Sequence, residues 1–319
     1  MSLIDKRIPY KPFEYPEILV YTEAIQKGYW VHTEVDFTAD IQDYNTALDE
    51  VKKEIHKRSI ISIAQVEVAV KGFWGDLYHY FPKPEINGLG ATFAECEFRH
   101  SEAYSRVLDV NGYTTAFEEE LQNPVFRDYN NMVVNIMKEG NKTIFEKLLF
   151  FVLVIENTSL FSKFANILSF THFDGLMKNT ANMIAWTSVD EDVHANAGIY
   201  LINKMREEGL ISKSINQAWI ENACRTFIYQ EDKMLDWIFE KGELPYYSKN
   251  QLLSYMKVRL NEALGKIGFE PVFNTTEKDR EPFKWFEEEI YANSMDDFFA
   301  KRPVDYTKHD KPVTADDLF

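Results

Sequence analysis

The sequence has little cysteine, glycine or proline. Only two cysteines, Cys96 and Cys224, occur among 319 residues, together with 13 Gly and 11 Pro. Two cysteines exclude a disulfide-rich scaffold and a Cys-rich zinc site. Because Gly and Pro interrupt regular structure, their scarcity predicts long, uninterrupted elements.

Long hydrophobic runs and an excess of positive charge are also missing. The longest purely apolar run, Leu148 to Ile155, has eight residues, whereas a membrane-spanning helix needs about 20. Residues 1–10 lack the apolar stretch of a secretion signal. With 35 Lys+Arg against 51 Asp+Glu, the net charge is −16, which repels nucleic acids and anionic lipids. We therefore expect a cytoplasmic protein that binds neither nucleic acid nor membranes.

Alternating strand patterns are nearly absent, and apolar residues recur at i, i+3 and i+4 among strong helix formers. The pattern predicts an all-α fold, in one domain because no long polar linker divides the chain. Helices are predicted at 37–57, 60–81, 91–111, 114–139, 142–170, 175–205, 212–240 and 247–266.

Several short breaks separate the predicted helices. Pro82-Lys83-Pro84 stops the second helix, Gly88-Leu89-Gly90 precedes the third, and Asn123-Pro124 kinks or restarts the fourth. Gly140-Asn141 and Gly209 end others. The tail from residue 294 is rich in Asp, Lys and Pro, and we expect it to be mobile.

The predicted helix at 142–170 is apolar on nearly all sides, which indicates burial at the centre of a bundle. Glu156 directly follows its longest apolar run. A buried carboxylate is costly unless it has a cationic partner, a proton or a metal ion.

Two Glu-x-x-His elements occur, Glu97 with His100 and Glu191 with His194. Residues three apart share a helix face, so each pair can bind one ion. Glu is abundant in this chain, so the two pairs alone are weak evidence. Each His could equally be an ordinary half-buried residue.

The order of these elements strengthens the case for a metal site. A carboxylate on the preceding apolar helix comes before each pair: Glu67 before Glu97, and Glu156 before Glu191. Two helices with Glu and two with Glu-x-x-His form a carboxylate-bridged dinuclear site in a four-helix bundle. Oxygen-rich ligation with one imidazole per metal suits iron or manganese better than structural zinc. The alternative is that Glu67 and Glu156 are neutral core carboxyls or reach solvent.

Further residues near the pairs have either a chemical or a packing role. Tyr104 lies one turn after His100 and could be a radical site or a core tyrosine. Asp190 could accept the N–H of a ligand imidazole or be a surface acid. Trp30 would ordinarily be a packing residue. Cys96 is expected to point away from the Glu97 face as a small packed side chain.

These residues together resemble the small, radical-generating subunit (R2 or beta) of class I ribonucleotide reductase, a ferritin-like protein. The resemblance covers nearly the whole chain. Its motifs are Trp30, Glu67, Glu97-x-x-His100-x-x-x-Tyr104, Glu156, Asp190-Glu191-x-x-His194 and the tail segment from Asp296 to Tyr306. It implies a ferritin-like helical bundle with a four-helix dinuclear metal core and extra helices over residues 1–293. A flexible docking tail would follow over residues 294–319.

The resemblance also implies roles for individual residues. The first metal would take Glu67, Glu97 and His100, and the second would take Glu156, Glu191 and His194, with Glu97 and Glu191 bridging.

Trp30, Asp190 and His100 resemble the family's buried relay, and Tyr306 resembles its tail tyrosine. Through these residues the oxidised metal pair would supply a one-electron oxidant to the large (alpha) subunit. That subunit reduces ribonucleotides to deoxyribonucleotides for DNA replication. Residues 315–319 resemble the docking end of the tail, and a homodimer is expected. Because the bundle begins early in the chain, we expect no nucleotide-sensing cone before it.

Position 67 is Glu, where many members with a tyrosyl radical carry Asp. Glu at this position resembles manganese-containing subtypes. We therefore expect a dimanganese oxidant with Tyr104 unoxidised; a diiron centre with a Tyr104 radical is the alternative, and a mixed Mn/Fe centre is a further option.

Other classes of protein share parts of this pattern. An R2-like ligand-binding oxidase or another stand-alone ferritin-like dimetal oxidase would use the same six ligands but would not need Trp30 or Tyr306. A ferritin-type storage protein would assemble into a large cage. A helical interaction protein without metal would leave Glu97 and Glu156 unexplained.

Overall fold

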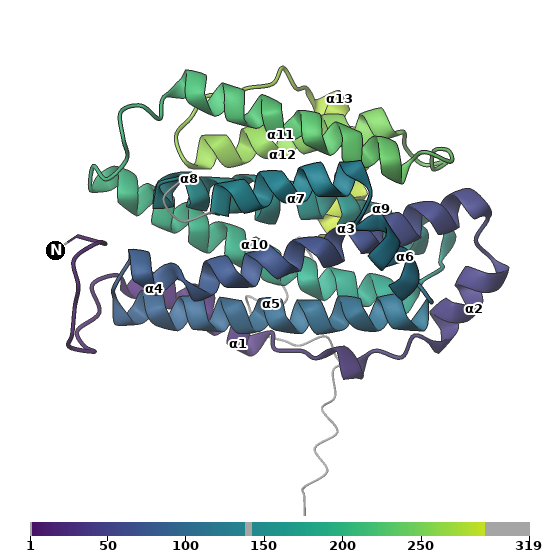
Figure 1. Ribbon diagram of the computed structural model, residues 1–319, viewed down its shortest axis with the longest axis horizontal. Coiled ribbons are helices and arrows are strands. Elements are labelled where there is room, and N and C mark those ends of the chain that lie inside the picture. The colour runs from purple at the N-terminus through teal and green to yellow at the C-terminus, as the bar shows by residue number, and fades with distance from the viewer. Residues whose placement is uncertain (1, 138–141, 291–319) are drawn as a thin grey trace, which may run out of the picture.

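The computed structural model describes residues 2–137 and 142–290, without the side chains of residues 67–71. Within these ranges the regular structure is entirely helical, with no strand, which confirms the all-α prediction (Figure 1). The α-helices are α1 (Leu19–Lys27), α2 (Thr38–Thr46), α3 (Glu50–Gly75), α4 (Leu77–Tyr80), α5 (Pro84–Val110), α6 (Thr114–Glu120), α7 (Pro124–Met137), α8 (Ile144–Leu149), α9 (Leu160–Asp174), α10 (Lys178–Glu207), α11 (Gln217–Ile238), α12 (Lys249–Lys266) and α13 (Glu277–Arg280).

Four shorter helical segments complete the fold. Three are 3₁₀ turns: η1 (Pro16–Ile18), η2 (His32–Glu34) and η4 (Glu281–Phe283). The fourth, η3 (Phe150–Ser159), is a π-helix that joins α8 to α9 without a break.

Four long helical segments form the core: α3, α5, α10 and the continuous segment of η3 and α9. The most extensive packing is between α3 and α5, and α10 packs along η3 and α9. The pairs are joined by contacts of α3 with α9 and of α5 with α10. Helix α1 packs on α5 and α10, while α11 and α12 lie on the opposite side, with α12 packed on η3 (Figure 1). This arrangement is a four-helix bundle with extra helices around it.

Local sequence signals explain where several helices begin. Asp49 caps α3 by accepting a hydrogen bond from the backbone N–H of Lys52 at 2.9 Å. Pro84 occupies the first turn of α5, where its missing N–H costs nothing. Ser248 and Gln251 form a capping box at α12.

Two predicted helix boundaries are wrong. A break between two helices was predicted at residues 58–59, but helix α3 runs through it without interruption. Helix α3 begins directly after its cap, Asp49. Helix α5 begins at Pro84 and runs through Gly88 and Gly90, which were predicted to precede it. Gly90 serves close packing rather than a turn, because a Cβ there would lie 2.6 Å from the backbone oxygen of Trp74.

Other predicted breaks have mixed outcomes. The restart at Asn123-Pro124 is confirmed, since α6 ends at Glu120 and α7 begins at Pro124. Helix α1 was not predicted, and it spans only nine residues. Gly140-Asn141 and the tail over 294–319 lie outside the described residues.

The burial predicted for the helix at 142–170 is confirmed from Lys147 onwards. Every residue from Lys147 to Phe170 is buried, including Glu156. The approach of α10 to this segment requires glycine at position 198, because a Cβ there would lie 2.0 Å from a methyl carbon of Val152. π-helical segments are rare and occur frequently at functional sites.

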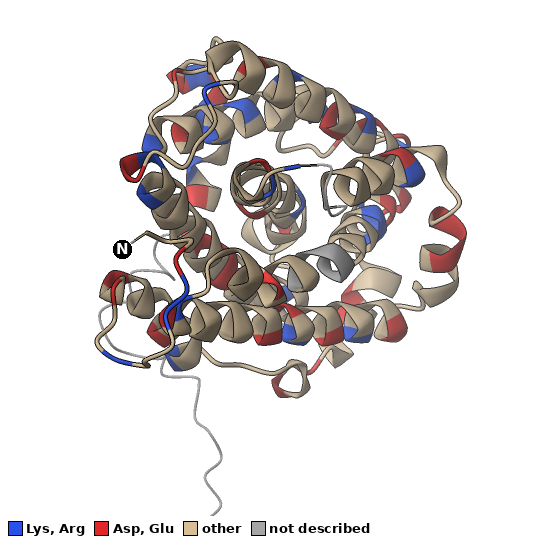
Figure 2. Ribbon diagram, turned by 60° about the vertical axis from the view of Figure 1, so that its left-hand side comes forward, with Lys and Arg blue, Asp and Glu red and all other residues tan. Residues whose placement is uncertain are grey.

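Charged residues of both signs are distributed along the outer helices (Figure 2). Among the helices of residues 2–137 and 142–290, none is long and apolar enough to cross a membrane.

Candidate metal centre

The bundle brings five of the six predicted metal ligands into one buried cluster. Helix α5 supplies Glu97 and His100, η3 supplies Glu156, and α10 supplies Glu191 and His194. All five side chains are at most 1% exposed. The sixth predicted ligand, Glu67, lies on α3, but its side chain is outside the described part of the chain.

Two carboxylates span the two imidazoles. Glu97 Oε2 lies 3.2 Å from His100 Nδ1, and Glu97 Oε1 lies 2.8 Å from His194 Nδ1. Glu191 does the same from the facing helix: Oε1 is 3.2 Å from His100 Nδ1, and Oε2 is 3.1 Å from His194 Nδ1. Each carboxylate can therefore bridge two ions, each of which has one imidazole.

Glu156 lies on the His194 side of the cluster. Its Oε2 is 3.7 Å from His194 Nδ1. One ligand atom from each of Glu97, Glu156, Glu191 and His194 falls within 4.8 Å of the others. This separation is small enough for one ion to contact all four groups.

Several of these oxygens have no hydrogen-bond partner besides the imidazoles. Glu97 Oε1, Glu156 Oε2 and Glu191 Oε1 are buried, and apart from the nearby imidazole nitrogens they have no hydrogen-bond partner. Buried carboxylate oxygens without donors are costly, and cations relieve that cost. Three carboxylates and two imidazoles fit a pair of divalent iron or manganese ions.

The pKa values reflect the crowding of three acids. Burial raises the pKa of Glu156 well above its usual range, and the charge of Glu191 adds to the effect. Burial opposes ionisation of Glu191 too, but hydrogen bonds from Glu156, His100 and His194 outweigh it and lower the pKa of Glu191. The pocket therefore requires positive charge or protons to hold its carboxyls together.

Trp74, near the end of α3, is a residue of the site that the sequence analysis missed. Its indole N–H donates to Glu156 Oε1 at 2.9 Å, and its ring packs 5.0 Å from that of Phe93. The hydrogen bond fixes one carboxylate oxygen and leaves Oε2 facing His194. Trp74 follows Glu67 by seven residues, and this same-face helical spacing could have identified it.

A chain of contacts leads from the cluster to the loop after α1. His100 Nε2 lies 3.1 Å from Asp190 Oδ2, which also accepts the indole N–H of Trp30 at 2.9 Å. The rings of Trp30 and His100 are stacked, with centroids 5.8 Å apart. Arg99 donates to the backbone oxygen of Trp30 at 3.0 Å, which holds the loop after α1 against α5. The structure thus brings together Trp30, Asp190 and His100.

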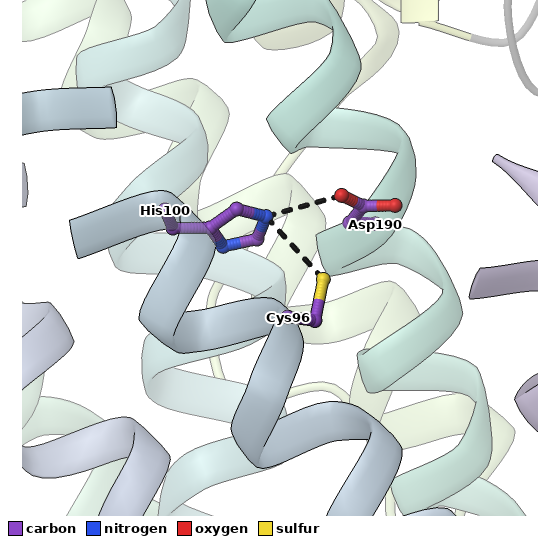
Figure 3. Close-up of side chains that lie close together, drawn as sticks. All are labelled: Cys96, His100 and Asp190. Atoms are coloured by element: carbon purple, nitrogen blue, oxygen red, sulfur yellow. Dashed lines mark hydrogen bonds and ion pairs between the residues drawn. The ribbon is translucent and has the colours of Figure 1, made fainter. Parts of the chain in front are cut away.

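Cys96 does not point away from the site as predicted. Its side chain is buried, and Sγ lies 3.5 Å from His100 Nε2, beside Asp190 (Figure 3). The reason is helical geometry: Cys96 and His100 are four residues apart and share a face of α5. The prediction of a small buried side chain is confirmed, and the predicted direction is wrong.

The structure describes one of the two predicted tyrosines. Tyr104 is fully buried on α5, one turn beyond His100. Tyr306 and the rest of the tail lie outside the described residues.

The fold and the donor set together define a class of protein. A helical bundle that gathers three Glu and two Glu-x-x-His histidines in a buried pocket is a ferritin-like protein with a candidate dinuclear metal centre.

Comparison with known proteins identifies the family. Residues 7–282 match the family "Ribonucleotide reductase, small chain". A probable ribonucleoside-diphosphate reductase small subunit from Invertebrate iridescent virus 3 is 26% identical, over 97% of this chain and 86% of its own length. The subunit beta from Chlamydia pneumoniae is 22% identical, over 87% of this chain and 83% of its own length.

Solved structures share the fold. The ribonucleotide reductase R2 subunit from Clostridium botulinum has a TM-score of 0.79 at 15% identity, covering 91% of this chain and 94% of its own. Dimanganese(II)-NrdF from Streptococcus sanguinis has a TM-score of 0.74 at 15% identity, covering 90% and 99%. The chain therefore belongs to the ribonucleotide reductase small-chain family and is a small subunit of a class I enzyme, an oxidoreductase.

Proposed function

We propose that this small subunit binds two metal ions per chain and supplies a one-electron oxidant to a large catalytic subunit, which reduces ribonucleotides to deoxyribonucleotides. One observation carries the proposal: Glu97 and Glu191 each place one carboxylate oxygen beside His100 and the other beside His194. In this assignment Glu67, Glu97 and His100 hold the first metal. The second is held by Glu156, Glu191 and His194, and Glu97 and Glu191 bridge.

We assign manganese as the favoured metal. The preference rests on Glu at position 67, where many tyrosyl-radical members of the family carry Asp. Iron in both sites is the next candidate, and a mixed pair is the third, because the same ligands accept both ions. When bound, the metal pair supplies the stored oxidising equivalent.

The chain's own residues connect the site with the partner. One oxygen of Asp190 accepts the indole N–H of Trp30 and also contacts His100 Nε2, so it can accept the indole proton when Trp30 gives up an electron. The ring of Trp30 is 2% exposed, which excludes water from this contact. Tyr306, in the tail beyond the described residues, would carry the oxidising equivalent onwards to the large subunit.

The tail would also dock the large subunit. Residues 315–319 combine acids with the apolar pair Leu318 and Phe319, a composition suited to a segment that orders on binding. We further propose a homodimer in the cytoplasm. Its mass would be about 75 kDa, twice the 37.4 kDa of one chain.

One experiment tests the function and its main rival. The metal-loaded protein is combined with the large subunit of the same organism, and deoxyribonucleotide formation is measured for the full chain and for a chain ending at residue 299. The proposal expects formation only with the full chain, together with loss of binding to the large subunit on truncation. A stand-alone oxidase would give no deoxyribonucleotide with either chain and would keep its oxidation chemistry after truncation.

A further inference from the structure

A second buried polar cluster lies at the end of η3, three residues after Glu156, and its printed contacts include none of the five ligands whose side chains the structure describes. Lys163 on α9 and Glu231 on α11 form an ion pair at 2.5 Å, and both side chains are at most 4% exposed. Ser159, the last residue of η3, donates to Glu231 Oε1 at 2.5 Å and accepts from Lys163 Nζ at 3.1 Å. Tyr129 on α7 contacts the same hydroxyl at 2.9 Å. Three helices are thus tied to the end of η3.

A second attachment holds the residue that follows Glu156. Arg259 on α12 donates from Nε to the backbone oxygen of Asn157 at 2.7 Å, and Asn157 donates in return to the backbone oxygen of Arg259 at 3.3 Å. The guanidinium lies 3.8 Å from the centre of the Phe161 ring. Two helices therefore restrain the residues that follow Glu156: α12 through Arg259 and α11 through Glu231.

The position of η3 decides where Glu156 points. The segment is π-helical between the α-helical turns of α8 and α9. A slip of one residue along an α-helix rotates a side chain by about 100°. A comparable slip in η3 would remove Glu156 from His194 and from the indole of Trp74. Keeping the wide π-helical turn thus requires restraints on the residues that follow it.

A contribution to stability does not explain why Lys163 and Glu231 form a buried ion pair. Desolvation of both charges offsets most of their attraction, and apolar residues of similar volume often replace such pairs without loss of stability. Lys163 and Glu231 instead place directional hydrogen bonds on Ser159, three residues after Glu156. Hydrogen bonds are directional and restrain η3 against rotation and sliding. Apolar packing restrains these movements only weakly.

We propose that Lys163 and Glu231 are positioning residues for the dinuclear centre, which hold the end of η3 through Ser159 so that Glu156 presents its carboxylate to the metal. The inference rests on the proposed metal site. It assigns a role to two buried charged residues that lie outside both the ligand set and the Trp30 relay.

The test compares metal binding with stability in matched variants. Lys163→Met and Glu231→Gln each break the pair, and Lys163→Met/Glu231→Met removes both charges. Glu85→Gln is the control, because it breaks another buried ion pair, Arg7–Glu85, which joins the N-terminal segment to the first turn of α5. Each protein is titrated with Co²⁺, whose visible absorption reports its coordination, and thermal unfolding is measured in parallel.

We expect the three pair variants to bind one of the two Co²⁺ ions about 10–100-fold more weakly, as for other residues that orient ligands, and to show a changed absorption spectrum. The Glu85→Gln control should lower the unfolding temperature without changing the spectrum. If a single variant fails to fold, the neutral double variant decides the outcome.

Wild-type spectra and affinities in the folded pair variants would overturn the positioning role, even if their unfolding temperatures fall. Failure of the proposed metal site would look different. In that case the wild-type protein itself would bind neither Co²⁺ nor Mn²⁺.

Discussion

Trp30 donates its indole N–H to Asp190 at 2.9 Å, although 160 positions separate the two residues in the chain. The accepting oxygen of Asp190 also lies 3.1 Å from His100 Nε2. A buried loop residue is thereby connected to a predicted metal ligand through a single carboxylate oxygen. Because this oxygen contacts both side chains, replacement of Trp30 leaves His100 with its contact to Asp190.

Replacement of Trp30 by Phe should separate cofactor formation from turnover. Phe preserves most of the packing but cannot donate to Asp190 and is much harder to oxidise. We expect normal metal content and loss of nearly all deoxyribonucleotide formation with the large subunit. Trp219→Phe, a half-buried tryptophan on α11, is the control and should retain activity. Turnover that survives in Trp30→Phe would rule out the relay.

Removal of a ligand should lower metal occupancy. Glu97→Ala and His194→Ala each remove a metal ligand from the cluster. Mutation of residues that only hydrogen-bond to ligands typically lowers metal affinity about 10–100-fold, and loss of a ligand itself should lower it further. Metal bound per chain is measured after dialysis. Glu102→Ala changes an exposed residue of the same helix and should bind metal normally. Two tightly bound ions in both ligand variants would show that the assignment is wrong.

The role of Tyr104 depends on the metal. With a dimanganese oxidant, Tyr104 is not oxidised, and Tyr104→Phe should retain most of the activity. Electron paramagnetic resonance of active protein should then show no tyrosyl radical. A tyrosyl signal that disappears in Tyr104→Phe together with activity would instead support the diiron alternative.

His56 should make the stability of the fold depend on pH. Its side chain is fully buried beside Tyr113, and burial lowers its pKa from 6.5 to about 4. His56 is thus neutral in the folded protein, whereas the unfolded chain takes up a proton below pH 6.5. The free energy of unfolding should therefore fall by about 3 kcal/mol between pH 6.5 and pH 4 from this residue alone.

Urea unfolding across this pH range checks the expectation. The decrease should be smaller by about that amount in His56→Phe, which has no group to protonate. His79→Gln changes an exposed histidine, with 78% of its side chain accessible, and should follow the wild type. Parallel curves for wild type and His56→Phe would contradict the prediction.

Much of the fold follows from the sequence because its helices are long and periodic. Helix periodicity alone places Glu97 with His100, and Glu191 with His194, on shared faces. The start of α5 was predicted too late in the chain, because glycine usually ends helices. Gly90 instead allows α5 to approach the backbone of Trp74, and this contact depends on the tertiary structure.

The surroundings of the site were harder to predict than the ligands. The contact of Cys96 with His100 follows from i, i+4 spacing and was open to prediction. The hydrogen bond of Trp74 to Glu156 connects two helices, so spacing within α3 indicates only its face. The π-helical form of η3 depends on how neighbouring helices pack, and no local pattern in the sequence indicates it.

Metal content is the most direct test of the account. Protein purified from its native host is analysed for metals by mass spectrometry, and the number of ions per chain is determined. The account predicts close to two Mn ions per chain; two Fe ions would keep the dinuclear site and change the assigned metal. No bound metal, even after anaerobic loading with both ions, would contradict the dinuclear site and the proposed one-electron oxidant with it.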